Sequence, residues 1–170
     1  MRKLIFIGLL LLTSLGTQAQ TQYAHINMGN LISDMPAAQA ANAELEVFQK
    51  ELIAKGEAMA AAFQEEYVAF AKAVQGGTLP PVKQQEQQAV LEQKQQDIMA
   101  YEQQIGVDIN KKRDELLQPI IEKAQKAIAD VARENNIQLV FDTSIFGAIM
   151  FAAESEDLMP KVKAKLNIVD

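Results

Sequence analysis

The chain has 170 residues and a formal net charge of −6 at pH 7, with no cysteine and a single histidine. This composition excludes disulfides, cysteine nucleophiles and histidine-rich metal sites. The acidic balance also argues against binding to nucleic acid and against general adhesion to anionic lipid.

The first 19 residues have the pattern of a secretory signal peptide. Arg2 and Lys3 supply the positive start, residues 4–12 the apolar stretch, and residues 17–19 the small residues at a cleavage site. The apolar stretch is too short for a stop-transfer helix, and no cysteine follows it to accept a lipid. We therefore expect cleavage after Ala19, which leaves an exported, soluble chain with 14 basic and 22 acidic residues.

Residues 23–27 alternate in the manner of a short strand, with either Ala24 and Ile26 or Tyr23 and His25 facing inward. Residues 28–32 are predicted to turn the chain. Pro36 then stands where a long helix would begin.

Two long helical runs, joined at residues 76–81, dominate the sequence. The joining segment, Gly-Gly-Thr-Leu-Pro-Pro, favours a turn between antiparallel helices. Apolar residues in both runs recur at the three-, four- and seven-residue intervals of a coiled-coil seam. The predicted seam consists of Leu45, Phe48, Leu52, Met59, Phe63, Phe70 and Val74 in the first run and Leu91, Ile98, Tyr101, Ile105, Ile109, Leu116 and Ile120 in the second. At about 1.5 Å per residue, a paired arm of ~40 residues would be roughly 60 Å long.

Two residues should disturb these helices. Gly56 is expected to interrupt the first run and let it bend, because glycine costs about 1 kcal/mol relative to alanine in a helix. Pro119 is expected to kink the second run, since it lacks the backbone donor that the helix needs. The apolar stripe also broadens after Pro119, over residues 120–131, as suits a helix lying on a sheet.

The C-terminal part is predicted to form strands and a final helix. Asn135 and Asn136 should end the second helical run. A strand over residues 137–142 and an apolar strand over residues 146–152, covered on both faces, should follow. The acidic residues 154–157 would then cap a last helix with Leu158, Val162 and Leu166 on one face.

These elements predict an α+β fold in which a long antiparallel helical hairpin, a coiled-coil arm over residues 37–119, projects from a small β-rich body. The body comprises residues 20–36 and 120–170. A two-helix arm buries little surface per residue, and a body of this size is near the limit for a lone core. We therefore expect the chain to oligomerise.

The sequence offers no catalytic constellation, so we expect a protein that is not an enzyme and needs no cofactor or metal. His25 stands alone on a strand, where a structural role is more common than a catalytic one. No glycine-rich loop follows a strand in the way that phosphate binding requires. Residues 111–113, Lys-Lys-Arg, form either a charged helix face or a docking point for an anionic partner.

Four segments resemble the Skp (OmpH-like) family of periplasmic chaperones. They are residues 24–31 (AHINMGNL), 127–132 (AIADVA), 137–142 (IQLVFD) and 156–158 (EDL). The resemblance implies a periplasmic homotrimer whose strands form a body and whose three arms enclose a cavity. Such a protein would hold unfolded outer-membrane β-barrel proteins without ATP, and would not insert stably into a membrane. Well-known members are strongly basic, whereas this chain is acidic, so the resemblance does not extend to a basic lipopolysaccharide-binding site.

Two sets of residues are candidates for these roles. Apolar residues near the tip or off the strict seam would contact clients: Met59, Tyr67, Val82, Val90 and Met99. Apolar residues of the strands would form the trimer interface: Ile26, Leu139, Val140, Phe141, Ile149 and Phe151. Each client-binding candidate could instead pack helix on helix. A structural coiled-coil spacer or adaptor of the cell envelope is the alternative function.

Overall fold

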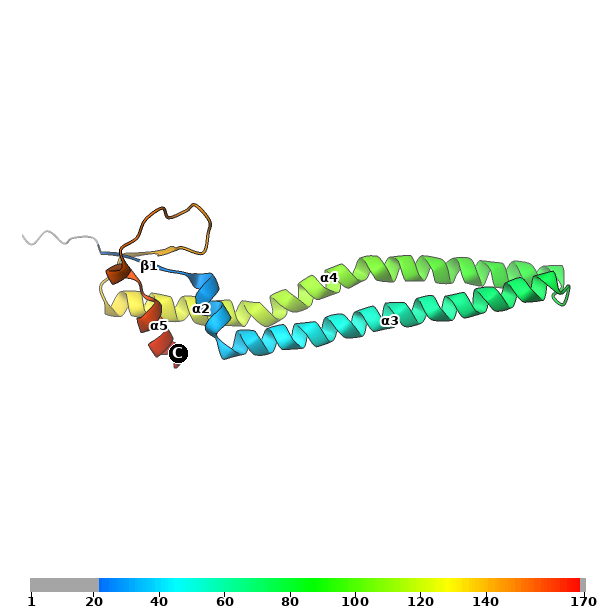
Figure 1. Cartoon of the computed structure of the whole chain (residues 1–170), viewed down its shortest axis with the longest axis horizontal. Coiled ribbons are helices and arrows are strands. Elements are labelled where there is room, and N and C mark those ends of the chain that lie inside the picture. The colour runs from blue at the N-terminus through cyan, green and yellow to red at the C-terminus, as the bar shows by residue number, and fades with distance from the viewer. Residues whose placement is uncertain (1–21, 169–170) are drawn as a thin grey trace, which may run out of the picture. The chain divides into compact units, whose positions relative to one another are not determined.

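A computed structural model describes residues 22–168, in two compact units. The sheet unit contains the described residues up to Leu31 and from Lys126 onward, and the hairpin unit contains residues 32–125. Figure 1 gives the order of the elements. The signal peptide predicted for residues 1–19 lies outside the described residues.

Two long helices run side by side in the hairpin unit (Figure 1). Helix α3 spans Pro36–Gln75 and begins with its proline in the first turn, as predicted. Helix α4 spans Pro81–Glu134, and its residues up to Gln125 belong to this unit. The turn between them is tight: Gly77 has a φ of 63°, and the Thr78 N–H and hydroxyl both donate to the Ala73 carbonyl. The connection between the two helices comprises residues 76–80.

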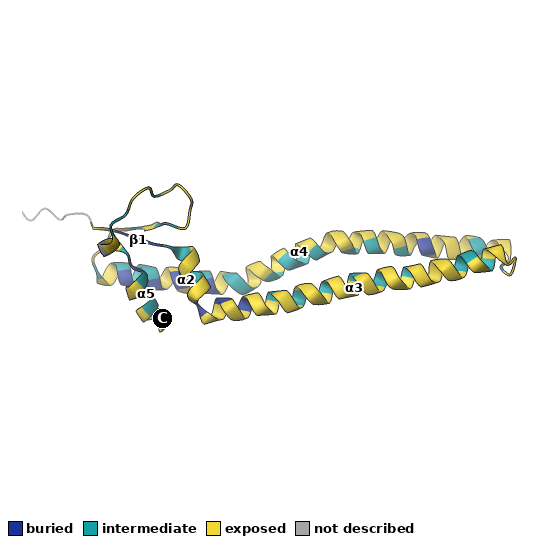
Figure 2. Cartoon of the chain, viewed as in Figure 1, coloured by how far each residue is buried: buried dark blue, intermediate teal, exposed yellow. Residues whose placement is uncertain are grey.

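The apolar seam holds these two helices together. Every predicted seam residue except Val74 is half-buried or buried, and Leu91 and Ile120 are the most covered. The remaining surface of α3 and α4 is largely exposed (Figure 2). The seam prediction is therefore confirmed.

Neither Gly56 nor Pro119 breaks its helix. The expected interruption at Gly56 is wrong, because α3 is continuous from Pro36 to Gln75. Helix α4 continues through Pro119, and the kink expected there stays a prediction. Packing along the seam outweighs the local cost of each residue, as it often does when a helix has a long apolar contact face.

In the sheet unit, strand β1 (Tyr23–Ile26) pairs in parallel with strand β2 (Leu139–Asp142), with Tyr23 opposite Leu139 and Ile26 opposite Asp142. Ala24 and Ile26 are 3% and 2% exposed, whereas Tyr23 is 49% exposed. The first of the two predicted orientations of β1 is thus the one that occurs. Asn136, with a φ of 56°, ends the preceding helix in the left-handed conformation expected of asparagine there.

Residues 28–34 form a helix, α2 (Met28–Asp34), where the sequence was expected to turn. The Asn27 side chain accepts from the Asn30 N–H at 2.9 Å, and the Asp142 carboxylate accepts from the Met28 N–H at 3.2 Å. These two acceptors satisfy N–H groups of the first turn, which have no partner within the helix. The capping role of Asn27 explains why these residues form a helix and not the expected turn.

Residues 146–152 do not form the predicted strand. Gly147 has a φ of 77°, and the described part of the chain has only the two strands β1 and β2 in its sheet. The apolar run was expected to be covered on both faces, yet Phe146, Met150 and Phe151 are 104%, 92% and 87% exposed. The prediction is wrong because an apolar run indicates only that its side chains favour burial. The pattern does not specify that the surface burying them belongs to the same chain.

The chain closes the sheet unit with a 3-10 turn, η2 (Glu154–Glu156), and helix α5 (Met159–Leu166). Leu158 and Val162 are buried and Leu166 is half-buried, which confirms the predicted apolar face. The Asp157 carboxylate accepts from the Met159 N–H at 2.8 Å. Lys165 pairs with Glu134 at the end of α4, and Leu158 N–H donates to the His25 carbonyl at 2.9 Å.

Asp142 fixes the junction between β2 and α2. Burial raises the pKa of its carboxyl group, but hydrogen bonds from the Ser144 N–H and hydroxyl and from the Met28 N–H outweigh this, so the pKa lies below its ordinary value. A depressed folded-state pKa contributes stability above the unfolded-state pKa of about 3.9, and that contribution is lost as the pH falls through the folded-state value.

Asp142→Asn should therefore lower the free energy of unfolding near neutral pH, because it removes the charge that strengthens these hydrogen bonds. The deficit relative to the wild type should shrink below about pH 4, where the wild-type carboxyl group also becomes neutral. Urea denaturation from pH 7 downward measures this difference. A deficit that stays constant over the whole range would contradict the assignment.

Candidate functional site

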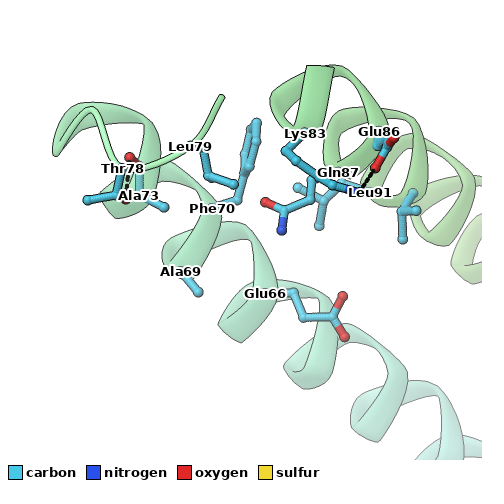
Figure 3. Close-up of a pocket in the computed structure, with 11 residues that line it drawn as sticks. Glu66, Ala69, Phe70, Ala73, Thr78, Leu79, Lys83, Glu86, Gln87 and Leu91 are labelled. Carbon is cyan, nitrogen blue, oxygen red and sulfur yellow. Dashed lines mark hydrogen bonds and ion pairs between the residues drawn. The ribbon is translucent and has the colours of Figure 1, made fainter. Parts of the chain in front are cut away.

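An apolar groove lies at the tip of the hairpin unit, between the ends of α3 and α4 (Figure 3). Its volume is about 730 Å³. Phe70 and Leu79 lie side by side at one end, and the Gln87 amide points into the space between the helices (Figure 3). Ala69, Ala73, Val90 and Leu91 add further apolar surface. A groove of this size and lining can accept one or two large apolar side chains.

The turn and a charged rim border this groove. Gln84 donates to the Leu79 carbonyl at 2.9 Å, and this bond fixes the segment that carries Leu79. Charged side chains form the rim: Lys83 pairs with Glu86, and Glu66 pairs with Lys94 across the two helices. Both pairs are largely exposed, so each adds at most about 1 kcal/mol. The seam, not the rim, therefore maintains the groove.

A second, smaller cavity of about 220 Å³ lies further along the hairpin. Met59, Ala62, Phe63 and Ile98 supply its apolar lining, with Lys94 and Asp97 beside them. The Phe63 ring stacks on that of Tyr67 with a centroid distance of 6.2 Å. The cavity and the exposed Tyr67 ring extend the apolar surface along α3.

The structure separates the five client-binding candidates into two groups. Four are more than half exposed: Tyr67, Val82, Val90 and Met99. Met59 is half-buried and lines the smaller cavity, while Val90 lines the tip groove. Their role in binding stays a prediction. Phe70, Leu79 and Leu91 were not among the candidates, because only the pairing of the two helices brings them together.

The middle of the hairpin contains a polar contact across the seam. The Tyr101 hydroxyl donates to the Leu52 carbonyl at 3.1 Å, and the Lys55 ammonium lies 5.0 Å from the Tyr101 ring centroid. A Cβ atom on Gly56 would lie 3.5 Å from the Tyr101 ring, an ordinary van der Waals contact. Gly56 therefore leaves room beside Tyr101 without being required for the packing.

The sheet unit carries a different surface, the apolar patch formed by one face of the sheet and the segment that follows β2. On the sheet, Tyr23, Leu139 and Phe141 are exposed, and the rings of Tyr23 and Phe141 lie 6.3 Å apart. The following segment adds exposed side chains of Ile145, Phe146, Met150 and Phe151. Sequence reasoning missed four members of the patch: Tyr23, Ile145, Phe146 and Met150.

The trimer-interface candidates differ in how far they are exposed in the single chain. Leu139, Phe141 and Phe151 belong to the apolar patch, and Val140 and Ile149 are half-buried. Ile26 is buried within its own unit, so it can offer little surface to another chain. Whether the remaining five meet another copy stays a prediction.

His25 has a structural contact. Its Nε2 atom lies 3.0 Å from the Ala153 carbonyl, to which it donates when that nitrogen carries the proton. Over residues 22–168, no group of three or more His, Asp or Glu side chains is placed to hold a metal ion. Over the same residues, no helix combines the length and apolar character needed to cross a bilayer.

The basic residues 111–113 are engaged on the helix surface. Lys112 pairs with Glu44 at 2.7 Å and lies 5.9 Å from the Phe48 ring centroid, and the hydrogen bond to Glu44 raises the Lys112 pKa. Lys111 lies 3.9 Å from Glu115, and Arg113 donates to Asn110 at 2.8 Å. These contacts favour the charged-helix-face alternative over an anion-docking point.

The family model for outer membrane proteins of the OmpH-like type matches residues 22–166, and the chain belongs to this family. Among curated proteins, none matches this chain significantly. A crystal structure from Caulobacter crescentus, described as that of a candidate outer membrane chaperone (OmpH-like), shares the fold with a TM-score of 0.74. The two sequences are 17% identical, and the match covers 88% of this chain and 85% of the other.

Gly56→Ala should raise the free energy of unfolding by about 0.5–1 kcal/mol, because alanine is the better helix former and its Cβ atom fits beside Tyr101. Gly106→Ala on α4 is the matched reference, since its Cβ atom would meet nothing within 4 Å. Urea denaturation of both variants measures the two gains. A loss for Gly56→Ala beside a gain for Gly106→Ala would show that the hairpin requires closer packing at Gly56.

Proposed function

We propose that this protein is an ATP-independent periplasmic holdase that binds unfolded outer-membrane β-barrel proteins between the arms of a homotrimer. The observation that carries the proposal is the apolar surface left on the hairpin unit after the seam has formed. That surface includes the tip groove, the smaller cavity and the exposed side chains of Tyr67, Val82, Val90 and Met99. Membership of the OmpH-like family supports it further.

Holding an unfolded client requires many weak contacts that form and break without fuel. Separate apolar sites along each hairpin would each bind a client side chain modestly. Linking such sites raises the effective concentration of the client, so that the sum outlasts any single contact. Release then needs only the loss of a few contacts when the client begins to fold.

Assembly follows from the apolar patch on the sheet unit. Contiguous exposed apolar surface is uncommon on isolated soluble chains and marks an interaction site. The side chains of Phe146, Met150 and Phe151 are almost fully exposed in the single chain. In this proposal, the copies of a homotrimer cover one another's patches and so form the body from which the hairpins extend.

The direct test is aggregation of an unfolded outer-membrane β-barrel protein diluted from urea, followed by light scattering without nucleotide. The chain without residues 1–19 should suppress aggregation at about one trimer per client. Unchanged aggregation at that ratio would reject the holdase function. Stable capture of a folded envelope protein, with indifference to unfolded clients, would instead support the spacer or adaptor alternative.

Assembly has its own test. Leu139→Asp and Phe151→Asp should each shift the mass measured by light scattering from trimer towards monomer, because each would bury an unpaired carboxylate in the interface. Both side chains are exposed in the single chain, so their replacement should leave the monomer folded. Val47→Asp, at an exposed position on α3, is the matched control. If both patch variants remained trimeric, the trimer interface would have to lie elsewhere on the chain.

A further inference from the structure

We infer that the tip groove is a selective subsite for extended client segments in which an apolar side chain is flanked by lysine or arginine. This inference rests on the proposed holdase function and specifies which part of a client the hairpin tip would prefer. It follows from three properties of the groove: its apolar floor, its polar centre and the charge around it.

The floor provides the apolar part of the recognition. Phe70 and Leu79 lie side by side at one end of the groove (Figure 3), and Val90 and Leu91 continue the apolar surface on α4. Val90 is 52% exposed, so a bound side chain would remove substantial apolar surface from water. The volume of about 730 Å³ accommodates an aromatic ring together with part of the backbone that carries it.

The centre of the groove suits an extended backbone. The Gln87 amide points into it (Figure 3) and carries both a donor and an acceptor. A peptide group in an extended segment presents its N–H and carbonyl to the sides, where such an amide can pair with it. A folded helix has already paired these groups, so the groove favours unfolded chain.

The charge around the groove gives the selectivity. Among the residues that line the groove, Glu66 and Glu86 are acidic and Lys83 is basic. Lys83 is already paired with Glu86, and Lys94 beside the lining is paired with Glu66. Glu92 follows the lining residue Leu91 and accepts from the neutral amide of Gln88, so its charge is not compensated by that bond.

The remaining negative potential reaches a bound peptide. Charges act over about 10 Å at 0.1 M ionic strength, so the carboxylates that line the groove act on a peptide bound in it. Lysine or arginine on either side of the apolar residue would therefore be attracted, and glutamate or aspartate repelled. Anionic lipid headgroups would be repelled in the same way.

Fluorescence anisotropy with labelled peptides tests this inference on the chain without residues 1–19. The peptides share length and a Gly/Ser/Thr background, with a central phenylalanine flanked by lysine, serine or glutamate. A fourth peptide has lysines around a central serine.

The lysine–phenylalanine peptide should bind about tenfold more tightly than the glutamate–phenylalanine peptide, as expected of two or three exposed ion pairs. This ratio should approach one at about 0.5 M salt. The lysine–serine peptide should bind more weakly than both lysine- and serine-flanked phenylalanine peptides.

Two variants locate the subsite. The double variant Glu66→Gln/Glu86→Gln leaves Lys94 and Lys83 without these carboxylate partners, so the preference for lysine should disappear or invert. Val90→Ser should weaken binding of every phenylalanine peptide severalfold and leave the charge preference in place. Glu51→Gln and Val107→Ser, on α3 and α4 outside the groove lining, are the matched controls and should change neither.

The outcomes separate this inference from the holdase function. Equal binding of the lysine- and glutamate-flanked peptides by a wild-type protein that still suppresses aggregation overturns the subsite and leaves the holdase function standing. The subsite is also overturned if the preference for lysine is lost in Glu51→Gln but kept in the double variant Glu66→Gln/Glu86→Gln. A wild-type protein that prefers the lysine–phenylalanine peptide, yet fails to suppress aggregation, supports the subsite and overturns the holdase function.

Discussion

A single narrow seam carries most of the stability of the hairpin unit. Along α3 and α4 its residues are mostly half-buried, and Leu91 is one of the few that are buried near the tip. Two helices in contact cannot surround each other, so most seam residues keep one side towards solvent. The same limitation that makes the hairpin marginal also creates its apolar surface. Side chains just off the seam, such as Val90 and Tyr67, have no second layer to cover them.

The sheet unit is stabilised differently, by short-range polar contacts around a small core. Ala24, Ile26, Leu158 and Val162 provide the buried apolar surface. Backbone and capping hydrogen bonds then join segments that are distant in sequence, as when Asp142 accepts from Met28 and the His25 carbonyl accepts from Leu158. The exposed apolar patch beyond β2 lies outside this arrangement. It is the part of the unit whose cover we attribute to other copies.

Much of the hairpin could be predicted from sequence because its signals are local. Heptad spacing gives the seam, the Gly-Gly/Pro-Pro segment gives the turn, and Asn136 gives the end of α4. The errors arose where a local pattern has two meanings. Residues 28–34 contain a glycine and an asparagine, which suggested a turn, but Asn27 caps a helix instead. Residues 146–152 are apolar enough for a strand, yet pairing depends on a partner that no local pattern specifies.

The candidate site was predicted only in part, for a related reason. Exposed residues such as Val82 and Met99 can be identified from the sequence of one helix, because their positions fall outside its heptad seam. The tip groove requires Phe70 on α3, Leu79 in the turn and Leu91 on α4 to meet, and this depends on the register between two helices. Heptad spacing alone does not fix that register, because a slip by one heptad preserves the pattern, whereas the short connection at residues 76–80 does fix it.

The parallel pairing of β1 with β2 also sets an order of events during synthesis. Tyr23 emerges from the ribosome more than a hundred residues before its partner Leu139. Until then β1 has no strand to complete it, and neither end of the chain can form its small core. Contacts beside residues 76–80 join residues that are close in sequence, so the hairpin can zip up from there and bring later residues back along earlier ones. The sheet can close only after β2 has emerged, and a nascent chain that stops short of β2 would leave β1 without its partner strand.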